Sequence, residues 1–178
     1  MITNALIKEN GNLSFFHRYN DKDVFICNST NSAVNSGSSV VSNALAGNGG
    51  IKYLYVAYMN GDGTISYPSI QPSTDISYFT SLINPYGCIK VPAYLVGDVG
   101  AGMVTMQGIT ASNLTPIAGD SFVVDSKVYA IGLVGVVNGV DTLFAIANIT
   151  DENDDNSYVS KLANAQIGIN WTVSTTIG

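Results

Sequence analysis

The feature that most constrains the fold is a pair of long apolar runs joined by Asn138-Gly139. The runs, Val128–Val137 and Val140–Ile149, are rich in Val, Ile and Leu and contain no proline. Asn-Gly suits the two central positions of a type I′ turn, where both residues need a positive φ, so the pattern predicts a β-hairpin. Both runs are too apolar for a sheet that has one face in water. At least one face must therefore be covered by a second layer.

A third run, Gln166–Ser174, alternates between apolar and polar residues. Such alternation is typical of a strand with one buried face. The apolar positions are Ile167, Ile169, Trp171 and Val173. Together with the hairpin, this run predicts an all-β domain, an antiparallel β-sandwich.

Most of the remaining elements are also predicted as strands. They are Leu13–Tyr19, Val24–Asn28, Ile51–Met59, Cys88–Val96 and Ala101–Ala111, with Thr64–Ile70 as a strand or an extended segment. Ile117–Val124 leads into the hairpin. Pro92 cannot donate to a strand ladder, so Cys88–Val96 is expected at a sheet edge. Ser38–Leu45 has apolar residues at helical spacing and stops at a glycine-rich stretch, which predicts the single short helix. Ile76–Ile83 is compatible with a strand or with a helical turn.

Composition limits the classes of partner. Of the 178 residues only 11% are charged, against about 25% in typical globular domains. The net charge is −6 with seven basic residues, which cannot supply a stripe that follows nucleic-acid phosphates. No secretory signal is expected at residues 1–12, and no apolar run reaches the ~18 residues of a membrane-spanning helix. A surface of small neutral polar groups is common in proteins that pack against copies of themselves, and it is also common in proteins outside the cell.

The sequence offers no catalytic or metal-binding set, and we expect no enzyme and no cofactor. His17 is the single histidine and lies in a strand-like run, without a nucleophile motif elsewhere. Cys27 and Cys88 are far apart, so two thiols are favoured over a disulfide, which stays open. One histidine and two distant cysteines do not make a usual zinc site.

Acidic residues are the candidates for two other kinds of chemistry, calcium binding and glycoside hydrolysis. Residues 151–156 place oxygens at alternating positions, as a calcium loop does, but Asn156 and Leu162 stand where such a loop needs Gly and Glu. A solvated acidic loop is favoured over a weak calcium site. Paired carboxylates for glycoside hydrolysis would have to come from scattered strand ends, and nothing selects a pair. These residues are Asp98, Asp120, Asp125 and Asp141.

The chain is rich in tyrosine, with ten residues, and this enrichment is the one feature of the composition that suggests a binding function. Its large ring and polar tip suit interfaces and sugar-binding faces as well as sheet packing. Five tyrosines gather in the first half, and packing in the sheet, a subunit or capsid interface, and contact with a glycan all stay open for them. They are Tyr53, Tyr55, Tyr58, Tyr67 and Tyr78.

The order of these elements resembles the β-sandwich module of tail-fibre and baseplate-type virion proteins of tailed bacteriophages. The resemblance rests on a helix that leads into residues 44–64, a loop with prolines, the hairpin at 128–150 and the last strand at 166–175. It covers residues 38–178. Residues 1–37 are left as an N-terminal arm or extra strands.

The resemblance implies a structural virion protein without catalytic residues. In tail, fibre or baseplate it would form a homotrimer, dock on other virion proteins, and reach the particle by assembly in the host cytoplasm. The alternatives are a capsid decoration or head-fibre protein, and a carbohydrate-binding module that attaches to a host-surface glycan. Neither nucleic acid nor a membrane is an expected partner.

Overall fold

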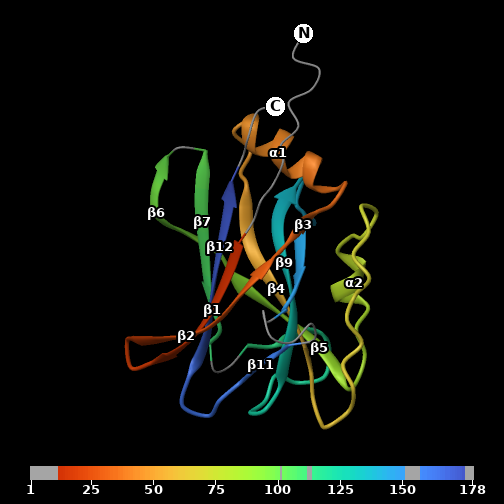
Figure 1. Ribbon diagram of the computed structural model, residues 1–178. Coiled ribbons are helices and arrows are strands. Elements are labelled where there is room, and N and C mark those ends of the chain that lie inside the picture. Colours follow the sequence, from red (N-terminus) through yellow and green to blue (C-terminus); the bar gives the residue numbers. More distant parts are fainter. Residues whose placement is uncertain (1–11, 101, 112–113, 151–156, 175–178) are drawn as a thin grey trace.

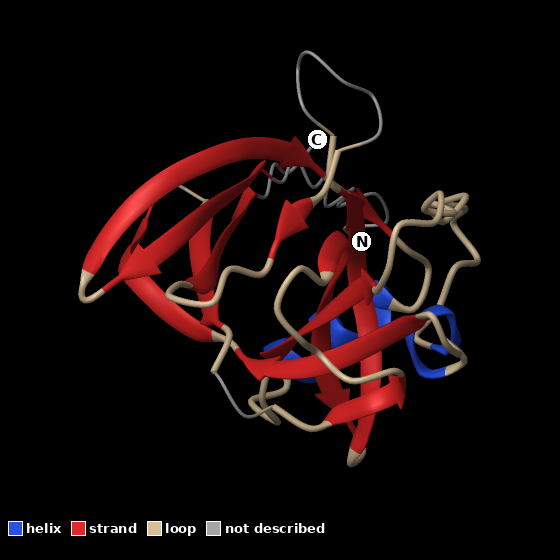
Figure 2. Cartoon of the chain, turned by 90° about the horizontal axis from the view of Figure 1, so that it is seen from below, coloured by secondary structure: helices blue, strands red, loops and turns tan. Residues whose placement is uncertain are grey.

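The computed structural model describes residues 12–100, 102–111, 114–150 and 157–174. Two antiparallel sheets pack against each other, as the sequence predicts (Figure 1). Seen from below, the body of the molecule consists of strands, and helices make up a small part of the chain (Figure 2). The fold is an all-β sandwich.

The first sheet has five strands in the order β2-β1-β12-β7-β6. Their bounds are β1 Asn12–Tyr19, β2 Lys22–Thr30, β6 Tyr94–Gly100, β7 Met103–Ile109 and β12 Gln166–Ser174. The chain's first described strand therefore lies inside a sheet, next to its last strand. The two sheet edges are β2 and β6.

The second sheet follows the order β3-β10-β9-β4-β5-β8, and β11 adds to β9. Its strands are β3 Ser32–Ala33, β4 Ile51–Met59, β5 Tyr86–Pro92, β8 Pro116–Gly119, β9 Lys127–Val137, β10 Val140–Asn148 and β11 Val159–Ser160. The turn between β9 and β10 has φ of 51° at Asn138 and 78° at Gly139. Both values are positive, which confirms the hairpin predicted from this dipeptide.

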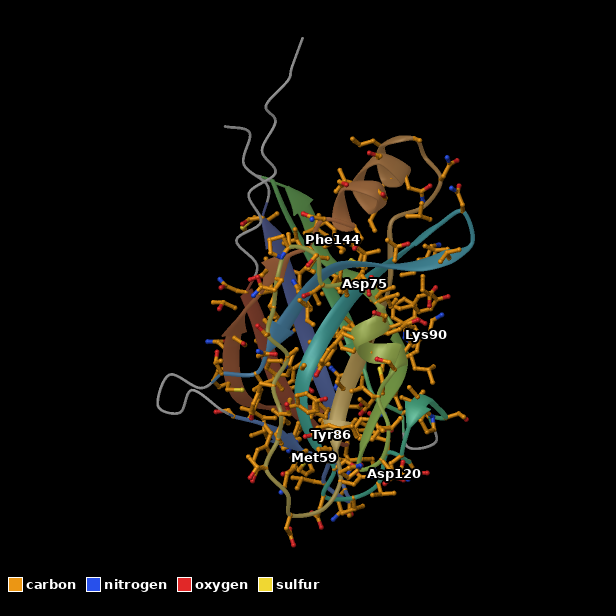
Figure 3. All side chains as sticks on the ribbon, turned by 90° about the vertical axis from the view of Figure 1, so that its right-hand side faces the viewer. Met59, Asp75, Tyr86, Lys90, Asp120 and Phe144 are labelled. Carbon is orange, nitrogen blue, oxygen red and sulfur yellow. The ribbon has the colours of Figure 1, made fainter. Side chains whose placement is uncertain are left out.

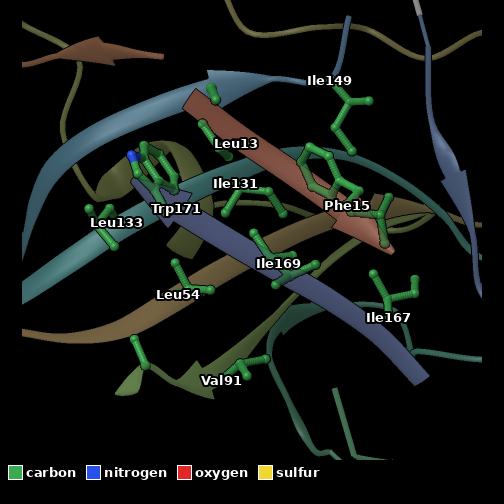
Figure 4. Packing of buried hydrophobic residues seen from close by; sticks show 14 of the residues in the cluster. Leu13, Phe15, Leu54, Val91, Ile131, Leu133, Ile149, Ile167, Ile169 and Trp171 are labelled. Carbon is green, nitrogen blue, oxygen red and sulfur yellow. The ribbon is translucent and has the colours of Figure 1, made fainter. Parts of the chain in front are cut away.

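The main core lies between the sheets (Figure 4). Alternate side chains of β1, β4, β9 and β12 point into it and are fully buried, because successive residues of a strand face opposite sides. Leu13, Leu54, Ile131, Ile169 and Trp171 are among them. The alternation predicted for the last strand is thereby confirmed.

A second apolar layer covers the outer face of the second sheet. Residues 60–85, which include the four-residue helix α2 (Ser77–Thr80), pack over this face. Figure 3, which views the molecule from the side of this layer, shows α2 in front of the strands of the second sheet. Because both faces of β4 and β9 are covered, their sequences are apolar almost without interruption.

Helix α1 (Gly37–Leu45) confirms the helix predicted at Ser38–Leu45 and lies against one end of β9 and β10. Its first residue has no room for a side chain, since a Cβ on Gly37 would lie 2.7 Å from the carbonyl oxygen of Phe144. The packing of α1 on the sheet end is therefore close at this point.

Two predictions about elements need correction, the edge strand Cys88–Val96 and the single helix. The single strand Cys88–Val96 is two strands, β5 and β6, because the chain leaves one sheet at Pro92 and enters the other at Tyr94. β5 is an inner strand, between β4 and β8, and Pro92 stands at its last position. The structure has a second short helix, α2, where the sequence predicts a single one, and this helix decides the open choice at Ile76–Ile83. Of the two forms left open for Thr64–Ile70, the strand is not formed.

The N-terminal part of the described chain contributes to both sheets. β1 and β2 belong to the first sheet, and β3 pairs with β10 in the second. The boundary between residues 37 and 38 stays a prediction. Within the described residues, the segment before it supplies core side chains such as Leu13 and Phe15.

Candidate functional site

The five tyrosines singled out from the sequence lie in or against the two apolar layers. Tyr55 and Tyr58 are 4% and 0% exposed and point to opposite faces of β4, so their rings serve internal packing. Tyr53, Tyr67 and Tyr78 are half-buried against the outer layer. Contact of these three with a partner or a glycan stays a prediction.

The outer layer contains a group of tyrosines around Tyr129 of β9. The Tyr78 hydroxyl donates to the Tyr129 hydroxyl at 3.0 Å, and the rings of Tyr67 and Tyr86 meet the Tyr129 ring edge-on at 5.8 and 5.7 Å. Burial raises the pKa of Tyr78 to about 12 and raises the pKa of Tyr129 further. The hydroxyls of Tyr78 and Tyr129 therefore stay protonated in the folded protein at ordinary pH.

A charged group on the same sheet links three strands. The Tyr55 hydroxyl on β4 donates to the carboxylate of Asp141 on β10, and Lys90 on β5 lies 2.6 Å from the same carboxylate. The Lys90 ammonium also lies 3.8 Å from the centre of the Tyr53 ring, in a cation–π contact. Each polar group here has a partner in the protein, so the arrangement ties strands together rather than presenting a reactive group.

The structure brings none of the described acidic candidates into a carboxylate pair. Asp141 faces Lys90 and Tyr55, while Asp120 accepts from the side-chain amide of Asn60 at 3.1 Å. Asp125 lies in a turn with a φ of 69°. Among the described residues no group of three or more His, Cys, Asp or Glu could hold a metal ion. Residues 151–156 and the side chain of Asp98 lie outside the description.

The contacts of the single histidine and the two cysteines are those of residues that support the fold. His17 Nε2 lies 3.0 Å from the carbonyl oxygen of Ser160, which links β1 to β11. Cys27 and Cys88 are both thiols, as predicted, and burial raises the pKa of the Cys88 thiol. Nothing in this geometry activates a nucleophile.

A polar hollow of ≈ 280 Å³ lies at the end of the sandwich where β1 stops. Arg18, Asn20, Lys161, Asn164 and Gln166 contribute to its lining. The guanidinium of Arg18 is paired with Asp23 at 2.7 Å. Amide and ammonium groups around a hollow can bind hydroxyl or carboxylate oxygens, and sequence reasoning missed this place because its residues are far apart along the chain.

The two edge strands of the five-stranded sheet carry exposed apolar side chains. Val24 and Phe25 of β2 are 53% and 62% exposed, and Tyr94 and Leu95 of β6 are 68% and 52% exposed. Each edge also leaves one side of its backbone without a strand neighbour in the described sheet. Apolar side chains on an open edge favour contact with another protein surface.

Comparison with family models, with curated proteins and with solved structures finds no match to this chain. Among the helices of the described part, none is long and apolar enough to cross a membrane. The pair of apolar sheet edges is the strongest candidate for a functional site.

Proposed function

We propose that the chain is a structural, non-enzymatic component of a tailed-bacteriophage virion that assembles with copies of itself. Tail, fibre or baseplate is the favoured place, and decoration of the capsid or a head fibre is the alternative. The proposal is supported by the order of elements on which the resemblance rests: a helix at 37–45, a strand at 51–59, the hairpin at 127–148 and a last strand at 166–174. Its partners are other virion structural proteins.

The observation that carries self-assembly is the presence of two different apolar edges on one sheet. β2 and β6 lie at opposite ends of the five-stranded sheet, so the β2 edge of one copy can meet the β6 edge of the next. Contacts between two different surfaces are heterologous, and they form a closed ring when the rotation between copies is right. A threefold ring would bury both edges in every copy, in agreement with the expected trimer.

The full-length chain is expected to be a homotrimer in sedimentation velocity at micromolar concentration. Phe25→Asp on β2 and Tyr94→Asp on β6 should each convert the trimer to monomer, because a charge in either edge affects every interface of a ring. The measurement is the mass of the main species for each variant.

Ile83→Asp is the matched control for these edge variants, since Ile83 is 76% exposed but lies outside the edge strands. It should leave the trimer intact. A wild-type chain that stays monomeric at every concentration would contradict the proposed ring. Dissociation by Ile83→Asp alone would place the interface elsewhere.

Immunogold electron microscopy tests the place of the protein on a particle. An antibody raised against the recombinant chain is expected to label the tail, fibre or baseplate of virions from the source. Label spread over the head would support the capsid alternative. Particles that carry no label, although the epitope is shown to be accessible, would refute a virion role.

Label confined to the tail tip would support attachment to the host as a second function. The polar hollow beside Asn20 and Gln166 is the observation that favours it, because most of the predicted tyrosines are occupied in packing. A host-surface glycan that carries carboxylate or hydroxyl groups is the ligand class that its amides and Lys161 suit.

A further inference from the structure

An apolar groove opens at the end of the sandwich that carries α1. Its volume is ≈ 370 Å³, and its walls come from α1, the start of β4, β7, β10 and the end of β12. The lining is almost entirely apolar. It consists of Val40, Val41, Ala44, Leu45, Gly50, Ile51, Val104, Met106, Phe144 and Val173.

Nothing in the described chain covers the outer part of this groove. Leu45, the last residue of α1, is 85% exposed, and Met103 at the neighbouring end of β7 is 50% exposed. Water against such a surface costs about 25 cal/mol for each Å² of apolar area. A covering segment would therefore be stabilised mainly by apolar burial.

The position of β1 indicates which segment can cover the groove. β1 begins at Asn12, which is paired with Thr172 of β12, and the next residue of β12, Val173, is part of the groove wall. The eleven residues before β1 therefore join the described fold directly beside the groove. Ile7 is five residues from Asn12, and five extended residues reach up to about 18 Å.

The composition of that segment suits the groove. Residues 1–7 read Met-Ile-Thr-Asn-Ala-Leu-Ile, in which five of seven side chains are apolar and none is charged. The four residues after Ser174 also begin near the groove, but Ile177 is their single large apolar residue. A short tether makes binding of the first segment effectively intramolecular, at a local concentration in the millimolar range.

We propose that the groove binds the apolar side chains of residues 1–7 of the same chain, with Leu6 and Ile7 as the main anchors. This inference is independent of the virion proposal, because it needs neither a trimer nor a particle.

The test measures how fast a thiol placed in the groove reacts. Ala44→Cys puts a cysteine on the exposed side of α1 that lines the groove, and mass spectrometry of its peptide separates it from Cys27 and Cys88. In the full-length chain the thiol is expected to react at least about ten times more slowly than in the same chain with Leu6→Asp and Ile7→Asp. This ratio corresponds to a free energy of about 1.4 kcal/mol or more for binding of the segment in the groove.

Two controls separate binding of residues 1–7 from the effects of added charge and of general unfolding. Asn4→Asp with Asn10→Asp adds the same charge without removing an apolar anchor, and should keep the groove thiol slow. The thiol of Ile83→Cys, at an exposed position, should react at the same rate in all backgrounds, which excludes general unfolding as the cause.

Equal rates for the groove thiol with and without Leu6 and Ile7 would overturn the proposal. Protection that disappears on dilution would also overturn it, because the occupant would then be a second copy of the chain. Loss of protection with Ile177→Asp, and not with the Leu6 and Ile7 changes, would assign the groove to the residues after Ser174. Slow reaction that depends on Leu6 and Ile7 at every protein concentration supports it.

Discussion

Replacing Trp171 by alanine is expected to lower the free energy of unfolding by about 3–5 kcal/mol, the usual cost of removing a large aromatic side chain from a core. Trp171 is fully buried on β12, between its strand neighbours Leu13 of β1 and Met106 of β7. The cavity would open in the middle of the main core, where both sheets contribute side chains and neither can collapse easily. Urea unfolding followed by far-ultraviolet circular dichroism measures the change.

A phenylalanine at this position distinguishes packing from hydrogen bonding. The indole nitrogen of Trp171 is buried without a hydrogen-bond partner in the described structure. Trp171→Phe removes this unsatisfied donor together with part of the volume, so its cost should be clearly smaller than that of the alanine variant. Ile83→Ala, at an exposed position, should change stability by about 0.5 kcal/mol or less. A Trp171→Ala cost as small as this would contradict the central position of the ring.

Raising the pH above 10 is expected to unfold the protein in one cooperative step. Burial raises the pKa of Tyr55, Tyr58, Tyr78 and Tyr129 above the value of about 10 that tyrosine has in an unfolded chain. Above that pH the unfolded chain loses protons that the folded chain keeps. Stability is therefore complete below pH 10 and falls as the pH rises, by at most about 1.4 kcal/mol per pH unit for each fully buried tyrosine.

The measurement is a titration from about pH 8 to about pH 12 that follows tyrosinate absorbance and circular dichroism together. This range includes the ordinary pKa of tyrosine and extends toward the raised values. The part of the absorbance change that belongs to these four tyrosines should share the midpoint of the circular dichroism change, since their buried hydroxyls ionise when the fold opens. Tyr129→Phe should make the pH dependence of stability less steep by one group, although it also removes the hydrogen bond from Tyr78. Gradual ionisation of these tyrosines with the circular dichroism unchanged would contradict the prediction.

The elements that the sequence predicts correctly are those whose own residues show the pattern of a turn, a strand or a helix. The Asn138-Gly139 turn, the strands at 51–59 and 166–174 and helix α1 lie where the sequence predicts them, within one or two residues. Turn chemistry and the periods of two and 3.6 residues act between near neighbours, so they can be recognised without the rest of the fold.

The places where the chain changes sheets could not be recognised in this way. Cys88–Val96 has the composition of one strand with a proline, but its two halves belong to different sheets. The segment at 60–85 has only short and ambiguous signals for a strand or a helical turn, yet it covers the outer face of β4 and β9 and buries Tyr55. Pairing between distant strands is decided by the whole arrangement, and no short stretch encodes it.

The sequence by itself thus determined the class of fold, the central hairpin, and the absence of any recognisable catalytic motif among its residues. Tertiary structure alone decided which apolar side chains remain exposed: Phe25 and Tyr94 at the two sheet edges, and Leu45 beside the groove. Exposure depends on which strand has no neighbour and which helix face has no cover. Both are properties of the complete packing, and they carry the proposals made for this protein.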